Sequence, residues 1–210
     1  VLVLLSTSVF AQSGTSDNGT PSEIDDPLQM ATARFDSIIL ANAVDKEHAD
    51  KFGKLVIQDE GGRMKPINSF SSELLRKLSH TNTYKNLTSE QVLLSMIENP
   101  VAWYTGPLIY LKSRNDSLHN VLGIEKGAKY ASLTNFFNPD GSYKLSPFLE
   151  DAYRAQVRNQ FQKDYVEADQ RVNLFYDVLQ GELFKIFPIV NHPNNKWVSS
   201  REAVRENHFT

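Results

Sequence analysis

The sequence predicts an α+β domain that is predominantly helical, with a short N-terminal hairpin and several helices, including a long helix near residues 147–183. Two observations predict this class. Apolar residues recur at steps of three and four through most of the chain, and two short extended runs flank a pair of glycines. With 210 residues and 40% hydrophobic content, the chain has enough apolar surface for one ordinary core or two small ones.

The first predicted elements are a helix at 30–43 and a hairpin. A strand is expected at 54–58, and residues 59–62, Asp-Glu-Gly-Gly, supply the turn, because glycine adopts positive φ at little steric cost. Residues 63–67 return as a second extended segment. The hairpin therefore precedes the next helix directly.

Capping residues mark the next helix starts. Asn68 or Ser69 is expected to cap a helix that runs to about Leu78. Thr88 and Gln91 have the spacing of a capping box and open a further helix. The remaining predicted elements are a strand at 108–112, short helices at 118–122 and 130–137, a turn at 138–141 and a closing strand at 184–190.

Residues 147–183 carry the longest helical stripe, and no glycine or proline follows Pro147 until Gly181. As one helix the segment would be roughly 50 Å long at about 1.5 Å per residue, which is longer than a small domain needs. We therefore expect a bend or a projecting helix. The stripe consists of Leu149, Tyr153, Val157, Phe161, Tyr165, Ala168, Val172, Phe175 and Leu179.

The two ends of the chain indicate its location. Residues 1–11 resemble the end of a secretory signal, or of a transmembrane helix whose remaining apolar residues lie upstream, so we expect a fragment. Both interpretations place the rest outside the cytoplasm, on the periplasmic face of the membrane. Residues 12–29 are predicted to be a disordered tether, 30–200 an extracytoplasmic domain and 201–210 a truncated continuation.

Charge and cysteine content narrow the function classes. Basic residues number 22 and acidic residues 25, so the net charge is −3 and no cationic field favours nucleic acid as a partner. Cysteine is absent, which excludes thiolate catalysis, cysteine-ligated zinc, iron–sulfur clusters and disulfides. No P-loop, dinucleotide fingerprint or nucleophile elbow occurs, and no metal site is predicted, because the histidines are far apart. They are His48, His80, His119, His192 and His208.

The hairpin carries the best candidate binding site. If residues 63–67 are extended, Arg63 and Lys65 point to the same side, just ahead of a helix N-terminus that includes Asn68. These three residues are the candidate contact for a carboxylate, a phosphate or a haem propionate. The alternative is a hairpin whose basic residues pair with acidic neighbours. Those neighbours are Asp59, Glu60 and Glu73.

A second candidate is aromatic. Trp103 and Tyr104 lie between two prolines, and with residues 136–137, Phe-Phe, they are candidates for an apolar groove. Such clusters more often belong to a core. Both interpretations stay open at the level of sequence.

The segment from Phe52 to Lys77, with Gly-Gly-Arg-Met-Lys-Pro at its centre, resembles a segment of the large fused CcsA/CcsB (ResC/ResB) cytochrome c biogenesis proteins of system II. The resemblance covers most of the chain after about Ala43. It continues through residues 98–100, 107–112, 143–147, 171–174, 187–189 and 194–197.

The resemblance implies a membrane protein that exports haem and joins it to apocytochrome c as a haem lyase. This chain would be an accessory domain on the outer face, holding no cofactor itself, whose partners are the membrane domains of the same protein, apocytochrome c and, as a further candidate, haem. The family's Trp-rich motif and membrane histidines are absent here, since Trp103 and Trp197 stand alone. Catalytic residues are therefore not carried over, and the fragment is predicted to be non-catalytic. The alternative is a free secreted or periplasmic binding or adhesion domain, cleaved after Ala11.

Overall fold

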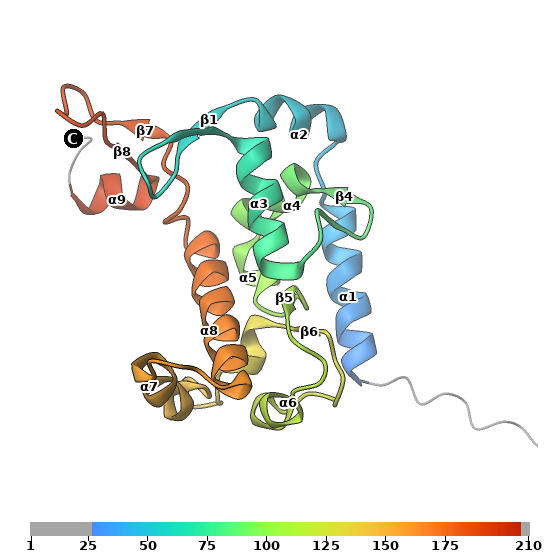
Figure 1. The fold of residues 1–210 in the computed structure, drawn as a ribbon. Helices are drawn as coiled ribbons and strands as arrows, with labels where there is room; N and C mark the ends of the chain where they lie inside the picture. Colours follow the sequence, from blue (N-terminus) through green and yellow to red (C-terminus); the bar gives the residue numbers. More distant parts are fainter. Residues whose placement is uncertain (1–26, 207–210) are drawn as a thin grey trace, which may run out of the picture.

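Helices form the framework of the protein, and the strands between them are two or three residues long (Figure 1). The computed structural model describes residues 27–206, and it confirms the predicted class, α+β and predominantly helical. The helices are α1 Pro27–Ala41, α2 Lys46–Gly53, α3 Ile67–Ser79, α4 Ser89–Glu98, α5 Pro100–Trp103, α6 Asp116–Leu122, α7 Ser146–Arg154, α8 Gln160–Leu179 and α9 Ser200–Arg205, with a 3-10 helix at Leu133–Phe136.

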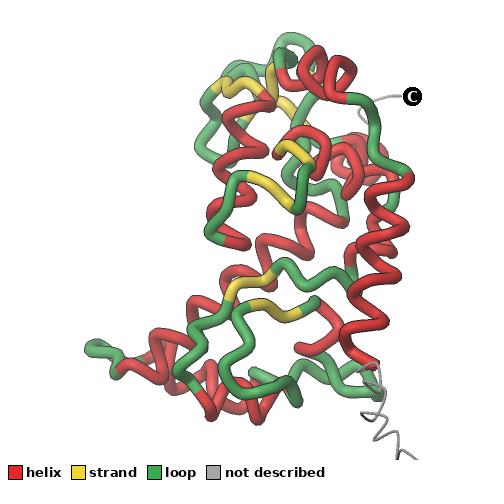
Figure 2. The backbone as a smooth tube through the Cα atoms, turned by 90° about the vertical axis from the view of Figure 1, so that its right-hand side faces the viewer, coloured by secondary structure: helices red, strands yellow, loops and turns green. Residues whose placement is uncertain are grey.

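The strands of the described residues form separate antiparallel pairs rather than one sheet, and Figure 2 shows them dispersed among the helices. Each pair closes a turn or joins two neighbouring loops. The pairs are β1 Val56–Gln58 with β2 Met64–Pro66, β3 Thr83–Tyr84 with β4 Leu87–Thr88, β5 Ile109–Tyr110 with β6 Tyr130–Ala131, and β7 Phe187–Pro188 with β8 Trp197–Val198.

The core lies where α3, α4 and α8 pack together, and α1 covers one side of it. Trp103 and Phe175 are completely buried there. Phe35 of α1 packs edge-on against Trp103, with ring centroids 5.1 Å apart. Gly106 makes this contact possible, because a Cβ at that position would lie 2.4 Å from Cζ of Phe35. The close approach of α1 therefore depends on a residue without a side chain.

An ion pair with a buried carboxylate joins the start of α8 to the segment after β5. Nζ of Lys112 lies 2.9 Å from Oδ1 of Asp164, whose side chain is 4% exposed. Burial alone would raise the pKa of Asp164, but hydrogen bonds from Lys112, Gln160 and Asn115 outweigh burial and lower it. The charge of Asp164 is therefore matched by donors, as a buried charge requires.

Local signals in the sequence predicted several elements correctly. The hairpin at residues 56–66 and the turn at 138–141 are present, the latter closed by a hydrogen bond of 2.9 Å from the Gly141 N–H to the Asn138 carbonyl. The capping box is confirmed, since Thr88 accepts from the Gln91 backbone N–H and Gln91 accepts from that of Thr88. These features depend on residues within a few positions of each other.

Other predicted elements were wrong in their bounds or type. The helix expected to be capped by Asn68 or Ser69 begins at Ile67, with Pro66 before it and no side-chain cap. Residues 130–137 form β6 and a 3-10 helix instead of a helix, because residues 130–131 pair with β5. Of the closing strand predicted at 184–190, only β7, Phe187–Pro188, is a strand in the structure.

The stripe at 147–183 is divided in two, which accounts for the expected bend. α7 ends at Arg154, and α8, the long helix of 20 residues, begins at Gln160. Asn159 caps α8 in a capping box with Gln162, a signal that sequence analysis could have used. α7 folds back and packs against α8.

The predicted segment 1–11, residues 12–26 of the predicted tether and residues 207–210 lie outside the described residues. α1 begins at Pro27, within the predicted tether, and α9 crosses the predicted domain boundary after residue 200. Between residues 27 and 206, no helix has both the length and the apolar character that crossing a bilayer requires.

Candidate functional site: a groove between α3 and α8

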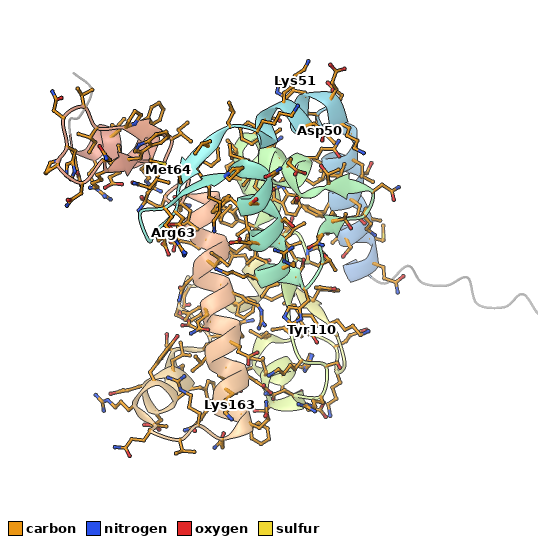
Figure 3. All side chains as sticks on the ribbon, turned by 45° about the horizontal axis from the view of Figure 1, so that its top comes forward. Asp50, Lys51, Arg63, Met64, Tyr110 and Lys163 are labelled. Carbon is orange, nitrogen blue, oxygen red and sulfur yellow. The ribbon has the colours of Figure 1, made fainter. Side chains whose placement is uncertain are left out.

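The predicted basic pair lies at one end of a groove between α3, α8 and the β1–β2 hairpin. Figure 3 shows Arg63 and Met64 on the hairpin beside one end of α8. The hollow at this end of the groove has a volume of about 250 Å³, an apolar floor and a charged rim. The floor consists of Phe70, Leu74, Leu174 and Leu183, and the rim of Asp59, Glu60, Arg63, Lys65, Glu73 and Lys77.

The hairpin turn sets the direction of both basic residues. Asp59 accepts the backbone N–H of Gly62 on its carbonyl and that of Arg63 on Oδ1, at 3.0 and 2.9 Å. Gly62 adopts φ +78°, which glycine takes at little cost. Lys65 pairs with Ile57 across the hairpin. Arg63 directly precedes β2 and Lys65 lies within it, and both side chains approach the same oxygen of Asp59.

Ion pairs occupy the basic residues of the hairpin, as in the second interpretation left open by the sequence. Nζ of Lys65 lies 2.7 Å from Glu73 Oε2 and 3.7 Å from Asp59 Oδ2, while Nε of Arg63 lies 3.7 Å from the same Asp59 oxygen. The two cations differ in exposure, since the side chain of Arg63 is 85% exposed and that of Lys65 is 23% exposed. Arg63 is therefore open to a further anion, and Lys65 would have to exchange partners.

Hydrogen bonds at this rim keep the carboxylates ionised. The pKa of Asp59 lies below its ordinary value, first because the Arg63 backbone N–H donates to it and then because the cations of Arg63 and Lys65 are close. A hydrogen bond from Lys65 lowers the pKa of Glu73. The rim consequently carries both signs of charge.

Asn68 does not share the hollow with Arg63 and Lys65. It lies in the first turn of α3 with an exposed side chain that accepts a hydrogen bond of 3.2 Å from Ser69. The backbone N–H of Ile67, at the start of the same helix, donates to Leu55 of the preceding segment. The predicted anionic contact at Asn68 is thus separate from the groove.

A second hollow of about 620 Å³ continues the groove along α3 and α8, since both are lined by Glu60, Lys77 and Leu174. Its far end holds His80 and Arg171, which lie far apart in the sequence. Nη2 of Arg171 lies 3.1 Å from Nε2 of His80. A guanidinium only donates, so this nitrogen of His80 accepts and its proton is on Nδ1.

The surroundings of His80 favour its neutral form. Its ring stacks on Tyr110 at 4.0 Å between centroids, and burial, followed by the charge of Arg171, lowers its pKa. Arg171 also donates from Nε to the Lys77 carbonyl at 3.1 Å. The C-terminal end of α3 is thereby fixed to α8, which holds the two sides of the groove together.

The two predicted aromatic residues have opposite positions. Trp103 is fully buried and donates from Nε1 to Ser95 at 3.1 Å, so its assignment to a groove was wrong and its place is the core. Tyr104 faces an open apolar hollow of about 520 Å³ beside Phe137, Pro139 and Tyr176. Phe136 is fully buried, so the Phe-Phe pair is divided in the same way.

Sequence reasoning missed Gln58, His80 and Arg171. Gln58 donates to the carbonyls of Gly62 and Asn195 and accepts from the Trp197 N–H, which connects the hairpin to β8. No spacing rule predicts such contacts, because their partners are remote in the chain. Between residues 27 and 206, no group of three His, Asp or Glu side chains is arranged to hold a metal ion.

Comparison of the sequence with known proteins shows similarity to a curated protein. No family model matches the chain. Over 161 residues the chain is 34% identical to Protein NrfI of Wolinella succinogenes, and the match covers 76% of this chain and 18% of NrfI. The chain is therefore similar to NrfI over most of its own length, and it spans less than a fifth of that relative.

Proposed function

We propose that this chain is an extracytoplasmic accessory domain of a membrane-bound cytochrome c biogenesis protein. The similarity to NrfI, 34% over 161 residues, is the observation that carries this proposal, and it supports a role in cytochrome c biogenesis and haem attachment. Haem export and attachment belong, in this proposal, to the remainder of a larger fused CcsA/CcsB-type protein. The domain organises the assembly or presents apocytochrome c.

The groove between α3 and α8 is the proposed contact for apocytochrome c. Its apolar floor is suited to aliphatic or aromatic side chains of an extended polypeptide, and Arg63 and Lys65 on the rim are suited to carboxylates. The exposed guanidinium of Arg63 offers two parallel donors, which a carboxylate accepts without displacing Lys65 from Glu73.

Maturation of cytochrome c tests this contact. We expect Arg63→Ala with Lys65→Ala in the full-length protein to lower the yield of haem-bearing cytochrome c, measured by haem staining. The control is Lys51→Ala with Lys126→Ala, which removes two exposed cations, each in a surface ion pair, away from the groove. Wild-type yield in the groove variant would remove the contact from the proposal.

A haem propionate is the second anion that the same rim could meet, and it has a separate test. Titration of the chain with haem is expected to shift the absorbance band, and the shift must disappear in the double variant. An equal shift in both proteins would assign haem binding, if present, to other residues.

A further inference from the structure

The connection between α7 and α8 exposes apolar side chains at one end of the molecule. We call residues 146–163, which comprise α7, the connection and the first turn of α8, the α7–α8 corner. Four large hydrophobic side chains are exposed there: Phe148 is 41% exposed, Tyr153 46%, Val157 89% and Phe161 59%. Val157 has the highest exposure among the large hydrophobic residues whose exposure the structure describes.

Phe148 and Phe161 both lie beside Tyr165 of α8. The ring of Phe148 stacks on Tyr165 with centroids 4.9 Å apart. Phe161 precedes Tyr165 by four residues on α8, so the two lie on the same face of the helix. Val157 is in the connection that leads into this turn. Exposed apolar residues that gather in this way indicate an interaction site.

The segment that carries Val157 and Phe161 has basic side chains and lacks acidic ones. Residues 154–163 contain Arg154, Arg158 and Lys163 and no acidic residue, in a chain whose net charge is −3. Glu150 pairs with Arg154 at 2.8 Å, and Asp151 is the other acidic residue of the corner. Apolar side chains beside cations are suited to the surface of a bilayer that contains anionic lipids.

The arginine of the connection is held in place. Nε of Arg158 donates to the Ala152 carbonyl at 2.8 Å, and its guanidinium lies 5.5 Å from the centroid of the Tyr153 ring. Val157 is thereby presented next to a cation whose position is fixed. A preordered contact of this kind loses little conformational entropy on binding.

The corner lies at the end of the molecule where α1 begins (Figure 1). Figure 3 shows Lys163 at the end of α8 opposite the end beside Arg63. The apolar run 1–10 precedes α1 in the sequence, with residues 11–26 between them. These 16 residues reach about 55 Å at most when fully extended. A membrane-inserted run would therefore hold the start of α1 within about 55 Å of the bilayer.

We propose that the α7–α8 corner rests on the lipid surface, with Phe148, Val157 and Phe161 in the interface and Arg158 and Lys163 against anionic headgroups. This inference rests on the proposed function, in which the chain belongs to a membrane-bound protein, and on membrane insertion of the apolar run 1–10, which we call the membrane tether. In this orientation the first turn of α8 lies at the bilayer and the helix runs away from it. The hairpin end of the groove, with Arg63 and Lys65, then faces the aqueous side, where a soluble partner approaches.

The absence of cysteine allows a direct test, because a single introduced thiol can be labelled. Val157→Cys, Val101→Cys and Val204→Cys replace valines that are 89%, 74% and 79% exposed. Each full chain is labelled with the fluorophore NBD and mixed with vesicles of phosphatidylcholine and phosphatidylglycerol. We expect a blue shift, and quenching by nitroxide-labelled lipid, at position 157 only. Phe161→Asp in the Val157→Cys chain should reduce both signals, with unchanged circular dichroism.

Co-sedimentation of the same samples with the vesicles distinguishes membrane attachment through the tether from lipid contact of the α7–α8 corner. If the chains co-sediment but position 157 responds no more than positions 101 and 204, the lipid contact of the corner is wrong and the tether stands. If the chains do not co-sediment and no position responds, both the tether and the corner contact are wrong. A response at position 157 that is equal in vesicles of phosphatidylcholine alone would overturn the role of the cations.

Discussion

The core around Trp103 and the groove between α3 and α8 use side chains in opposite ways. In the core, Trp103 is enclosed by Phe35 and Tyr84, and its one polar atom is bonded to Ser95. In the groove, Lys65 is shared between two carboxylates and Arg63 remains mostly in solvent. The core is therefore expected to determine stability, whereas the groove has charges that can exchange partners and is expected to determine binding.

The largest effect on stability should come from the core. Trp103→Ala removes a fully buried ring, and we expect a loss of about 3–5 kcal/mol in the free energy of unfolding, because both transfer energy and packing are lost. Urea denaturation followed by circular dichroism measures this loss. A change below about 1 kcal/mol would contradict the position of Trp103 in the core.

Asp164→Asn tests the ion pair between the buried carboxylate of Asp164 and the partly exposed ammonium of Lys112. We expect a loss of about 2 kcal/mol in the free energy of unfolding at neutral pH, since among residues 27–206 Lys112 then keeps Glu167 as its one charged partner. Because the folded state lowers the pKa of Asp164, its contribution is complete above the ordinary value of 3.8 and is lost as the pH falls through the lowered pKa. Urea denaturation at neutral and acidic pH should show the difference between wild type and variant narrowing in acid. If the difference in the free energy of unfolding were the same at both pH values, the destabilisation would come from packing and not from the charge of Asp164.

Gln58→Ala tests the support of the groove, because this buried side chain joins the hairpin of the groove to β8. Three hydrogen bonds are lost, to Gly62, Asn195 and Trp197, and we expect a loss of about 1–2 kcal/mol. Hydrogen exchange at the Trp197 amide should accelerate. The exposed Gln156→Ala serves as the control, and equal exchange rates in the two variants would show that Gln58 does not hold β8.

The smallest effect on stability is expected within the groove itself. Lys65→Met removes the ion pairs to Glu73 and Asp59, of which Glu73 is 41% exposed, so the loss should stay below about 1 kcal/mol. The same denaturation measurement checks it. A loss as large as that of Asp164→Asn would mean that Lys65 is a structural residue and would weaken its assignment to binding.

The same contrast separates what the sequence predicted from what it did not. Thr88 and Gln91, or residues 138–141, fix local geometry by contacts within a few residues, and they were predicted correctly. Trp103 and Tyr104 are adjacent, and only the packing of α1 and α4 decides which one enters the core. The β5–β6 pairing likewise converted a predicted helix at 130–137 into a strand and a 3-10 turn.

The candidate site shows the same limit. The basic pair of the hairpin was found because Arg63 and Lys65 lie two residues apart in the sequence, Arg63 just before β2 and Lys65 within it. The continuation of the groove depends on the contact between Arg171 and His80, which are 91 residues apart. No periodic pattern in the sequence predicts a contact over that separation. Asn68 was grouped with the pair by its sequence proximity, but the helix turns it away from the hollow.

The central claim is that the rim of the groove binds anionic groups of apocytochrome c, and calorimetric titration of the full-length protein with apocytochrome c tests it most directly. We expect Arg63→Ala with Lys65→Ala to bind roughly tenfold more weakly than wild type, and wild-type binding to weaken as salt is added. The Lys51→Ala, Lys126→Ala control should bind as wild type does. Equal affinities for the wild type and the groove variant, with no dependence on salt, would contradict the claim.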